Sequence, residues 1–132
     1  MSLDLARIVR VLETVAGAAV MDEYDLQREL HDALSLAGIE ATRERHLTGD
    51  GCRADIAIQD PDLPDGARRS LVVVEVKVDG SFADVERQLA RYAACSEVAA
   101  IILATTRSKH HGIPFELYGK PTRLVSLITA GL

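Results

Sequence analysis

The segment Leu71–Val78 most constrains this chain, because it is apolar and mostly β-branched except for two charged residues. Such a run is typical of a central strand that is buried on both faces. Glu75 and Lys77 stand two residues apart in it, so their side chains point to the same face. A buried carboxylate and ammonium cost free energy unless they are paired or bound to something. We therefore expect Glu75 and Lys77 to belong to a polar site.

The whole chain predicts an α/β protein in which helices flank a mixed central sheet, in the order α-α-β-β-β-α-β-β. The predicted helices are 2–18, 22–37 and 81–95, and the predicted strands are 41–47, 52–59, 71–78, 98–105 and 123–128. Ser2, Asp22 and Ser81 are the expected N-caps, and Gly38 ends the second helix. Residues 107–119 are interpreted as a loop.

Three further polar residues lie where they could join the same site. Asp55 stands on the strand that precedes Leu71–Val78. In the helix after Ser81, Gln88 and Tyr92 are four residues apart and are therefore neighbours on the edge of its apolar stripe. Spacing alone favours a core tyrosine and a solvated glutamine. Their place just downstream of the charged strand favours a role in the site.

The ordered set of Asp55, then Glu75-x-Lys77, then Gln88-x-x-x-Tyr92 resembles the PD-(D/E)xK nuclease superfamily, also called restriction-endonuclease-like. The glutamine and tyrosine match the QxxxY extension of its RecB-type branch. An E-x-K tripeptide alone is a very weak signal. The specificity of the resemblance comes from the order of the residues and from the helices and strands that carry them.

The resemblance covers roughly residues 22–105 and departs from the family pattern at two positions. Ala54 stands in place of the proline, and Arg53 stands where the RecB-type branch often has glycine. The resemblance implies a restriction-endonuclease-like core in a single nuclease domain over residues 1–132. The first helix, 2–18, would be an addition to that core.

A metal site is also implied by the resemblance, with Asp55, Glu75 and the backbone carbonyl of Val76 as ligands. Carboxylates are hard oxygen ligands suited to Mg²⁺, for which Mn²⁺ could substitute. Such a metal polarises a phosphate oxygen and lowers the pKa of bound water. Lys77 would hold the attacking water or stabilise developing charge. The predicted function is metal-dependent hydrolysis of phosphodiester bonds in DNA.

Supporting roles follow for residues around this centre. Gln88 and Tyr92 would orient Lys77 or a substrate phosphate through hydrogen bonds. The superfamily often carries a glutamate on the helix before the strands, and Glu29 is the candidate here, although a solvated boundary residue fits its position equally well. Glu44 could be a further polar member of the site, but a simple sheet-edge residue is the more natural interpretation.

The net charge of −5 lies in the first forty residues, and the remainder of the chain is balanced. Local basic groups, rather than total charge, make phosphate contacts. Such groups are Arg43/Arg45/Arg53, Arg87/Arg91 and Arg107/Lys109/His110/His111. The adjacent pair His110 and His111 does not suit chelation of one ion and is expected in an exposed loop. Cys52 and Cys95 predict reduced thiols rather than a disulfide framework or a zinc site.

Two other functions stay open at this point. The chain could be a catalytically silent nuclease-fold module that binds nucleic acid or a protein partner. It could also be an unrelated α/β protein with a structural Glu75–Lys77 pair. The apolar stripe of the first helix could pack into the core or pair two subunits in a homodimer. No apolar run reaches the roughly 18 residues of a membrane span, so a cytoplasmic protein is expected, and the form of the DNA stays undetermined.

Overall fold

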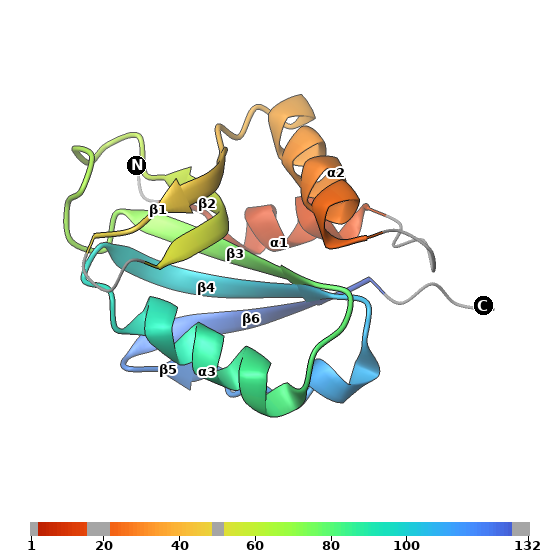
Figure 1. Cartoon of the computed structure of the whole chain (residues 1–132). Helices are drawn as coiled ribbons and strands as arrows, with labels where there is room; N and C mark the ends of the chain where they lie inside the picture. Colours follow the sequence, from red (N-terminus) through yellow and green to blue (C-terminus); the bar gives the residue numbers. More distant parts are fainter. Residues whose placement is uncertain (1–2, 16–21, 49–51, 128–132) are drawn as a thin grey trace.

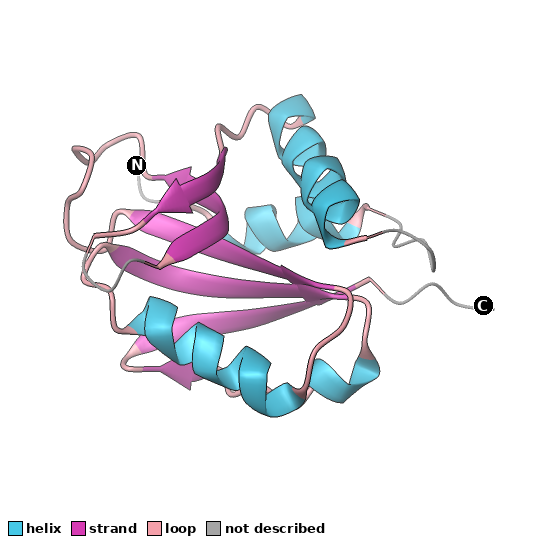
Figure 2. Cartoon of the chain, viewed as in Figure 1, coloured by secondary structure: helices cyan, strands magenta, loops and turns pink. Residues whose placement is uncertain are grey.

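The structure is a computed structural model that describes residues 3–15, 22–48 and 52–127. In this part of the chain, six strands form one mixed sheet in the order β1-β2-β3-β4-β6-β5, with helices on both faces (Figures 1 and 2). The helices are α1 (Leu5–Glu13), α2 (Glu23–Leu36), α3 (Phe82–Ala93) and the short 3₁₀ helix η1 (Ser108–His110). The strands are β1 (Thr42–His46), β2 (Arg53–Gln59), β3 (Leu71–Lys77), β4 (Val98–Thr105), β5 (Glu116–Leu117) and β6 (Lys120–Ser126). The predicted α/β class with a mixed sheet is confirmed.

Strand directions follow from the connections. The links β1–β2 and β2–β3 join antiparallel neighbours, whereas α3 carries the chain from β3 to its parallel neighbour β4. β6 is parallel to β4, and β5 is antiparallel to β6. The centre of the sheet is therefore β3 and β4, where the longest apolar strands lie.

β3 divides the core into two layers because its side chains alternate between the faces of the sheet. Val72, Val74 and Val76 pack in the layer that contains α1 and α2. Leu71 and Val73 pack in the layer that contains α3. By the same alternation, the polar side chains at the end of β3 face the α3 side.

Helix boundaries agree with the local capping signals except at the first helix. Asp22 and Ser81 accept hydrogen bonds from the helix starts of α2 and α3, as expected. In α1 the cap is Asp4, and the helix ends at Glu13. Four expected features lie outside the described residues: Ser2, Ala18, Ile128 and the turn residues 49–51. The apolar stripe of α1 packs inside this chain, because Ile8 and Leu12 are buried in the core with α2.

The C-terminal part holds one more strand than predicted. The segment interpreted as a loop contains η1 and β5, and β6 begins three residues earlier than expected, at Lys120. Tyr118 and Gly119 join β5 to β6 with φ of 50° and 75°, so both occupy the left-handed region. Such two-residue turns match the twist of a hairpin, but their usual signal is Asn-Gly or Asp-Gly. The sequence did not predict this hairpin because a tyrosine occupies the first position of its turn. In the described part of the chain, no helix is long and apolar enough to cross a bilayer.

Candidate active site

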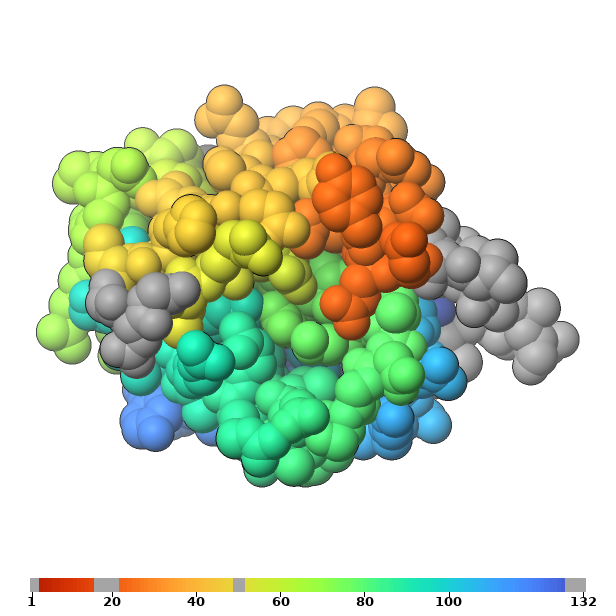
Figure 3. Space-filling view, in the orientation of Figure 1, coloured from red at the N-terminus to blue at the C-terminus, as the bar shows by residue number. Residues whose placement is uncertain are grey.

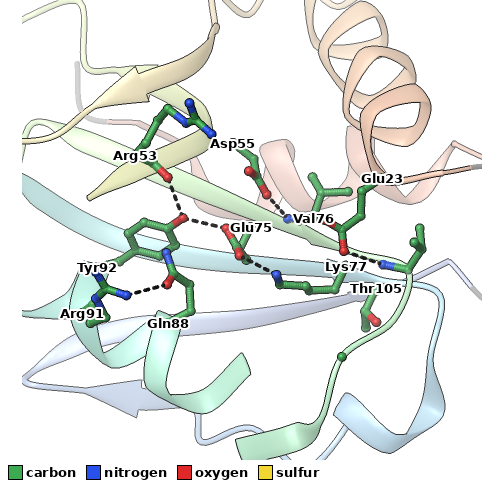
Figure 4. Close-up of polar contacts among 12 residues, drawn as sticks. Glu23, Arg53, Asp55, Glu75, Val76, Lys77, Gln88, Arg91, Tyr92 and Thr105 are labelled. Carbon is green, nitrogen blue, oxygen red and sulfur yellow. Dashed lines mark hydrogen bonds and ion pairs between the residues drawn. The ribbon is translucent and has the colours of Figure 1, made fainter. Parts of the chain in front are cut away.

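Four of the predicted site residues come together near the end of β3, on the face that α3 covers (Figure 4). Asp55 comes from β2, Glu75 and Lys77 from β3, and Tyr92 from α3. In the space-filling view this side of the molecule is divided between α2, β1 and β2 above and α3 below, with a recess between them (Figure 3). The sequence separated these residues by up to 37 positions, and the fold joins them.

Glu75 is the centre of the cluster and is only 4% exposed. The Tyr92 hydroxyl donates a hydrogen bond of 2.6 Å to Glu75 Oε1. The Lys77 ammonium lies 3.3 Å from Glu75 Oε2. Each carboxylate oxygen of this buried side chain thus has a partner, as a buried charge requires.

Asp55 occupies a place where two strands separate. The pairing of β2 with β3 ends at Ile56 and Val74. Beyond it, the Val76 N–H donates to Asp55 Oδ2 at 2.8 Å, so a side chain replaces the ladder partner. The N–H and C=O of one strand residue point to the same edge of the strand. The Val76 carbonyl is therefore directed to the side on which Asp55 lies.

Burial raises the pKa of both carboxyl groups, and the Asp55 charge raises that of Glu75 further. Burial and the nearby Asp55 charge raise the pKa of Glu75 to about 8, against the lowering effects of Tyr92 and Lys77. Burial also raises the pKa of Asp55, and the Val76 N–H partly offsets it. Burial lowers the pKa of Lys77, but the charges of Glu75 and other carboxylates outweigh it and leave that pKa above its usual value. The site thus holds a charged lysine beside two carboxyl groups that compete for a proton or a cation.

The Tyr92 hydroxyl has one proton and lies within hydrogen-bond distance of two oxygen atoms, one from Arg53 and one from Glu75. It lies 2.9 Å from the Arg53 carbonyl as well as 2.6 Å from Glu75. A carbonyl only accepts, so a protonated Glu75 can donate to Tyr92 while Tyr92 donates to Arg53. An ionised Glu75 can accept the tyrosine proton instead. Burial and the Glu75 charge raise the pKa of Tyr92, which keeps the hydroxyl protonated in either case.

Gln88 and Glu29 do not lie as the sequence predicted. Gln88 Oε1 accepts a long hydrogen bond of 3.4 Å from Arg91, and its amide is close enough to the Tyr92 hydroxyl to lower the tyrosine pKa. Within the described residues its interactions are with these two neighbours on α3 and not with Lys77. Glu29 is on the exposed side of α2. Its exposure agrees with the alternative interpretation, a solvated boundary glutamate.

Glu23, at the first position of α2, takes the place expected for Glu29. Its Oε1 accepts a hydrogen bond of 3.3 Å from the Val78 N–H, directly after β3 (Figure 4). Its charge also raises the pKa of Lys77. The sequence analysis missed this residue because Glu23 follows the cap Asp22 and resembles an ordinary helix-start acid.

Glu44 lies closer to the site than its place on an edge strand suggested. It faces Asp55 in register, between the pairs Arg43–Ile56 and Arg45–Ala54. Its φ of 54° is in the left-handed region, which is strained for a residue with a side chain. Its charge raises the pKa of Asp55, and its Oε2 lies 2.8 Å from Arg53 Nε. Glu44 is thus a marginal member of the cluster.

The donor set at this centre can accommodate a hard divalent cation. Within the described residues, no group of three or more His, Cys, Asp or Glu side chains could hold a metal ion. Mg²⁺ often uses one or two carboxylates and keeps several waters. Asp55, Glu75 and the Val76 carbonyl would supply three oxygen donors of the right kind, and water would have to supply the rest.

Comparison of the chain with protein-family models, with curated proteins and with solved structures finds no match. The geometry of the residues described above is therefore the basis for any statement about function.

Proposed function

We propose that this chain is a metal-dependent nuclease with a restriction-endonuclease-like core of the PD-(D/E)xK type, related to the RecB-type branch. It would hydrolyse phosphodiester bonds of DNA with Mg²⁺, for which Mn²⁺ could substitute. The proposal rests on one observation: carboxylates from β2 and β3 meet beside a lysine at the end of β3. Asp55 Oδ2 accepts the Val76 N–H at 2.8 Å, and Lys77 lies 3.3 Å from Glu75 Oε2.

The presence of two carboxylates favours the nuclease over a purely structural ion pair. A structural pair needs one carboxylate for one lysine, and Glu75 with Lys77 would suffice. Asp55 adds a second carboxylate whose pKa is raised by burial, and the Val76 N–H and Lys77 offset this only in part. A divalent cation would offset the rest, which favours a metal-binding role.

The residues around the carboxylates suit phosphodiester hydrolysis. A metal bound by Asp55, Glu75 and the Val76 carbonyl would polarise the phosphate and acidify bound water. Lys77 is charged because its pKa is raised, so it would hold an anion or stabilise developing charge rather than act as a base. Tyr92 holds Glu75 in place through its 2.6 Å hydrogen bond.

Exposed arginines flank the cluster and would contact phosphates. The Arg53 side chain is 57% exposed and lies on β2, and Arg91 is exposed on α3 (Figure 4). They come from the two segments that border the recess in Figure 3. Phosphate contacts of this kind fix the position of a nucleic acid without reading its sequence.

The decisive experiment is a cleavage assay on labelled single-stranded, duplex, flap and four-way-junction DNA with Mg²⁺ or Mn²⁺. We expect cleavage that EDTA and Asp55→Asn abolish. Asp84→Asn is the matched control, because Asp84 is an exposed carboxylate on α3 that pairs with Arg87. It should leave cleavage unchanged.

The other outcomes separate the alternatives. A folded protein that binds these DNAs without cutting them would support a silent nuclease-fold module. A protein that neither binds nor cuts, and whose stability does not respond to Mn²⁺, would make the Glu75–Lys77 pair structural and contradict the proposal.

A further inference from the structure

His110 is a buried histidine outside the carboxylate cluster. The sequence predicted an exposed loop here, and this prediction is wrong for His110, which is 0% exposed, although His111 is exposed. Both ring nitrogens of His110 have partners. Nδ1 lies 2.7 Å from Thr105 Oγ1, and Nε2 lies 2.8 Å from the Gly80 carbonyl oxygen.

The partners determine which nitrogen carries the proton. The Gly80 carbonyl can only accept, so Nε2 must be protonated. Thr105 Oγ1 already accepts the Arg107 N–H at 3.0 Å, which leaves its own proton free to be donated to Nδ1. A neutral ring with its proton on Nε2 therefore satisfies every group in this network.

These contacts connect three segments around Lys77. Thr105 is paired with Lys77 across the parallel strands β3 and β4, and the Thr106 N–H donates to the Lys77 carbonyl at 3.1 Å. Gly80 lies between Lys77 and Ser81, the cap of α3. Its φ of 101° is a conformation that favours glycine, so the chain bends sharply there. His110 thus fixes the end of β3 and the start of α3 against the end of β4.

We propose that His110 is a positioning residue for the nuclease centre. It holds the Gly80 bend so that Lys77 keeps its distance from Glu75 and α3 keeps Tyr92 on the same carboxylate. The inference rests on the proposed function for its effect on turnover. The placement of Lys77 is a physical property that can be measured without cleavage.

Three substitutions at His110 distinguish the effects of the two hydrogen bonds that its ring makes. His110→Gln keeps an amide N–H near the position of Nε2 and can still donate to Gly80. His110→Asn keeps an acceptor near the position of Nδ1 and loses the bond to Gly80. His110→Ala loses both. The exposed neighbour provides a control for the position of Lys77, because His111→Gln leaves both hydrogen bonds of the His110 ring intact.

We expect His110→Asn and His110→Ala to lower kcat by about 10- to 100-fold, because a misplacement of about 1 Å can have an effect of this size. KM should change by less than about threefold, because the DNA-contacting arginines keep their places. His110→Gln should recover most of the rate. The proposal is wrong if the asparagine variant, folded and equally stable, cleaves as fast as the glutamine variant.

A second measurement does not depend on cleavage. NMR of the histidine ring nitrogens should show the neutral tautomer with its proton on Nε2. The resonances of the Lys77 side chain should shift in His110→Asn and stay in place in His111→Gln. Unmoved Lys77 resonances in His110→Asn would overturn the inference. If the wild-type protein does not cleave DNA but the Lys77 resonances do shift in His110→Asn, only the proposed function would be overturned.

Discussion

Two buried glutamates on neighbouring segments of the sheet have opposite surroundings. Glu97, which directly precedes β4, is 2% exposed, and Glu75 in β3 is 4% exposed. Glu97 Oε1 accepts the Thr48 N–H at 2.5 Å and the Thr48 hydroxyl at 2.9 Å. Glu75 instead lies against Asp55 and Lys77 and has its pKa raised to about 8.

The difference shows that burial of a carboxylate does not by itself mark a functional site. Glu97 is held by neutral donors from one residue, Thr48, and links the β1–β2 connection to the start of β4. That is a structural role, because hydrogen bonds compensate the lost hydration. Glu75 shares its buried place with the like charge of Asp55, which raises the pKa of Glu75 although Lys77 lowers it, so a proton or a further cation is favoured there. Variants of the two glutamates test this contrast.

The largest effect is expected from Glu75→Gln on DNA cleavage. Loss of the central carboxylate should lower the single-turnover rate by about 10²- to 10³-fold or more with Mg²⁺, because it removes the charge of a proposed metal ligand and the partner of Lys77. Glu97→Gln should change the rate by less than about twofold per folded molecule. Equal losses in both variants, measured under the same conditions, would remove the distinction between the two residues.

The second prediction concerns the pH dependence of folding stability. The pKa of Glu75 is about 8 in the folded state and 4.5 is its usual value. As pH rises between these values, the unfolded chain loses this proton and the folded chain keeps it, so the free energy of unfolding falls. The fall should be on the order of a few kcal/mol and should end above about pH 8.

Glu75→Gln should remove most of this pH dependence, because glutamine does not titrate. This variant should be more stable than the wild-type protein at about pH 8.5. Mn²⁺ should restore stability to the wild-type protein at that pH, because it binds the folded state only, and should have little effect on Glu75→Gln. Urea unfolding between about pH 5 and about pH 9 measures both effects. A wild-type protein that becomes more stable over this range would contradict the assignment.

A smaller effect is expected from Tyr92→Phe, which removes the hydroxyl bound to Glu75. The rate should fall by about tenfold, and the pKa of Glu75 should rise further, since this hydrogen bond lowers it. The ascending limb of the pH–rate profile should therefore move to higher pH. Gln88→Ala should have less effect, because the contacts of Gln88 among the described residues are with Arg91 and Tyr92 rather than with Glu75. Tyr118→Phe, at an exposed tyrosine, is the control.

The smallest effect is expected from Thr48→Val, on the structural side of the comparison. Loss of one of the two hydrogen bonds to Glu97 should lower the free energy of unfolding by about 1–2 kcal/mol. Cleavage and the pH dependence of stability should match those of the wild-type protein. A Thr48→Val protein with a changed cleavage rate would show that Glu97 influences the site through the fold.

Local signals predicted much of the architecture. The caps Asp22 and Ser81 begin α2 and α3 as expected, and β4 has the predicted bounds. The apolar run with its two charges became the central strand β3. Alternation along a strand is a property of neighbouring residues, and it predicted that Glu75 and Lys77 share a face. The site role of Tyr92 was predicted from its place downstream of this strand, because spacing along the helix alone favoured a core tyrosine.

Tertiary structure decided the remaining contacts, because they depend on how distant segments sit against one another. Glu23 rather than Glu29 reaches the end of β3, since the rotation of α2 on the sheet selects the face that points inward. The Tyr92 hydroxyl makes its hydrogen bond to Glu75 rather than to Lys77, because the position of α3 against β3 determines which side chain of the strand it reaches. His110 is buried, although its neighbours look like an exposed loop, because Gly80 and Thr105 offer it partners. By itself the sequence determined which groups are present and on which elements, and packing determined which of them touch.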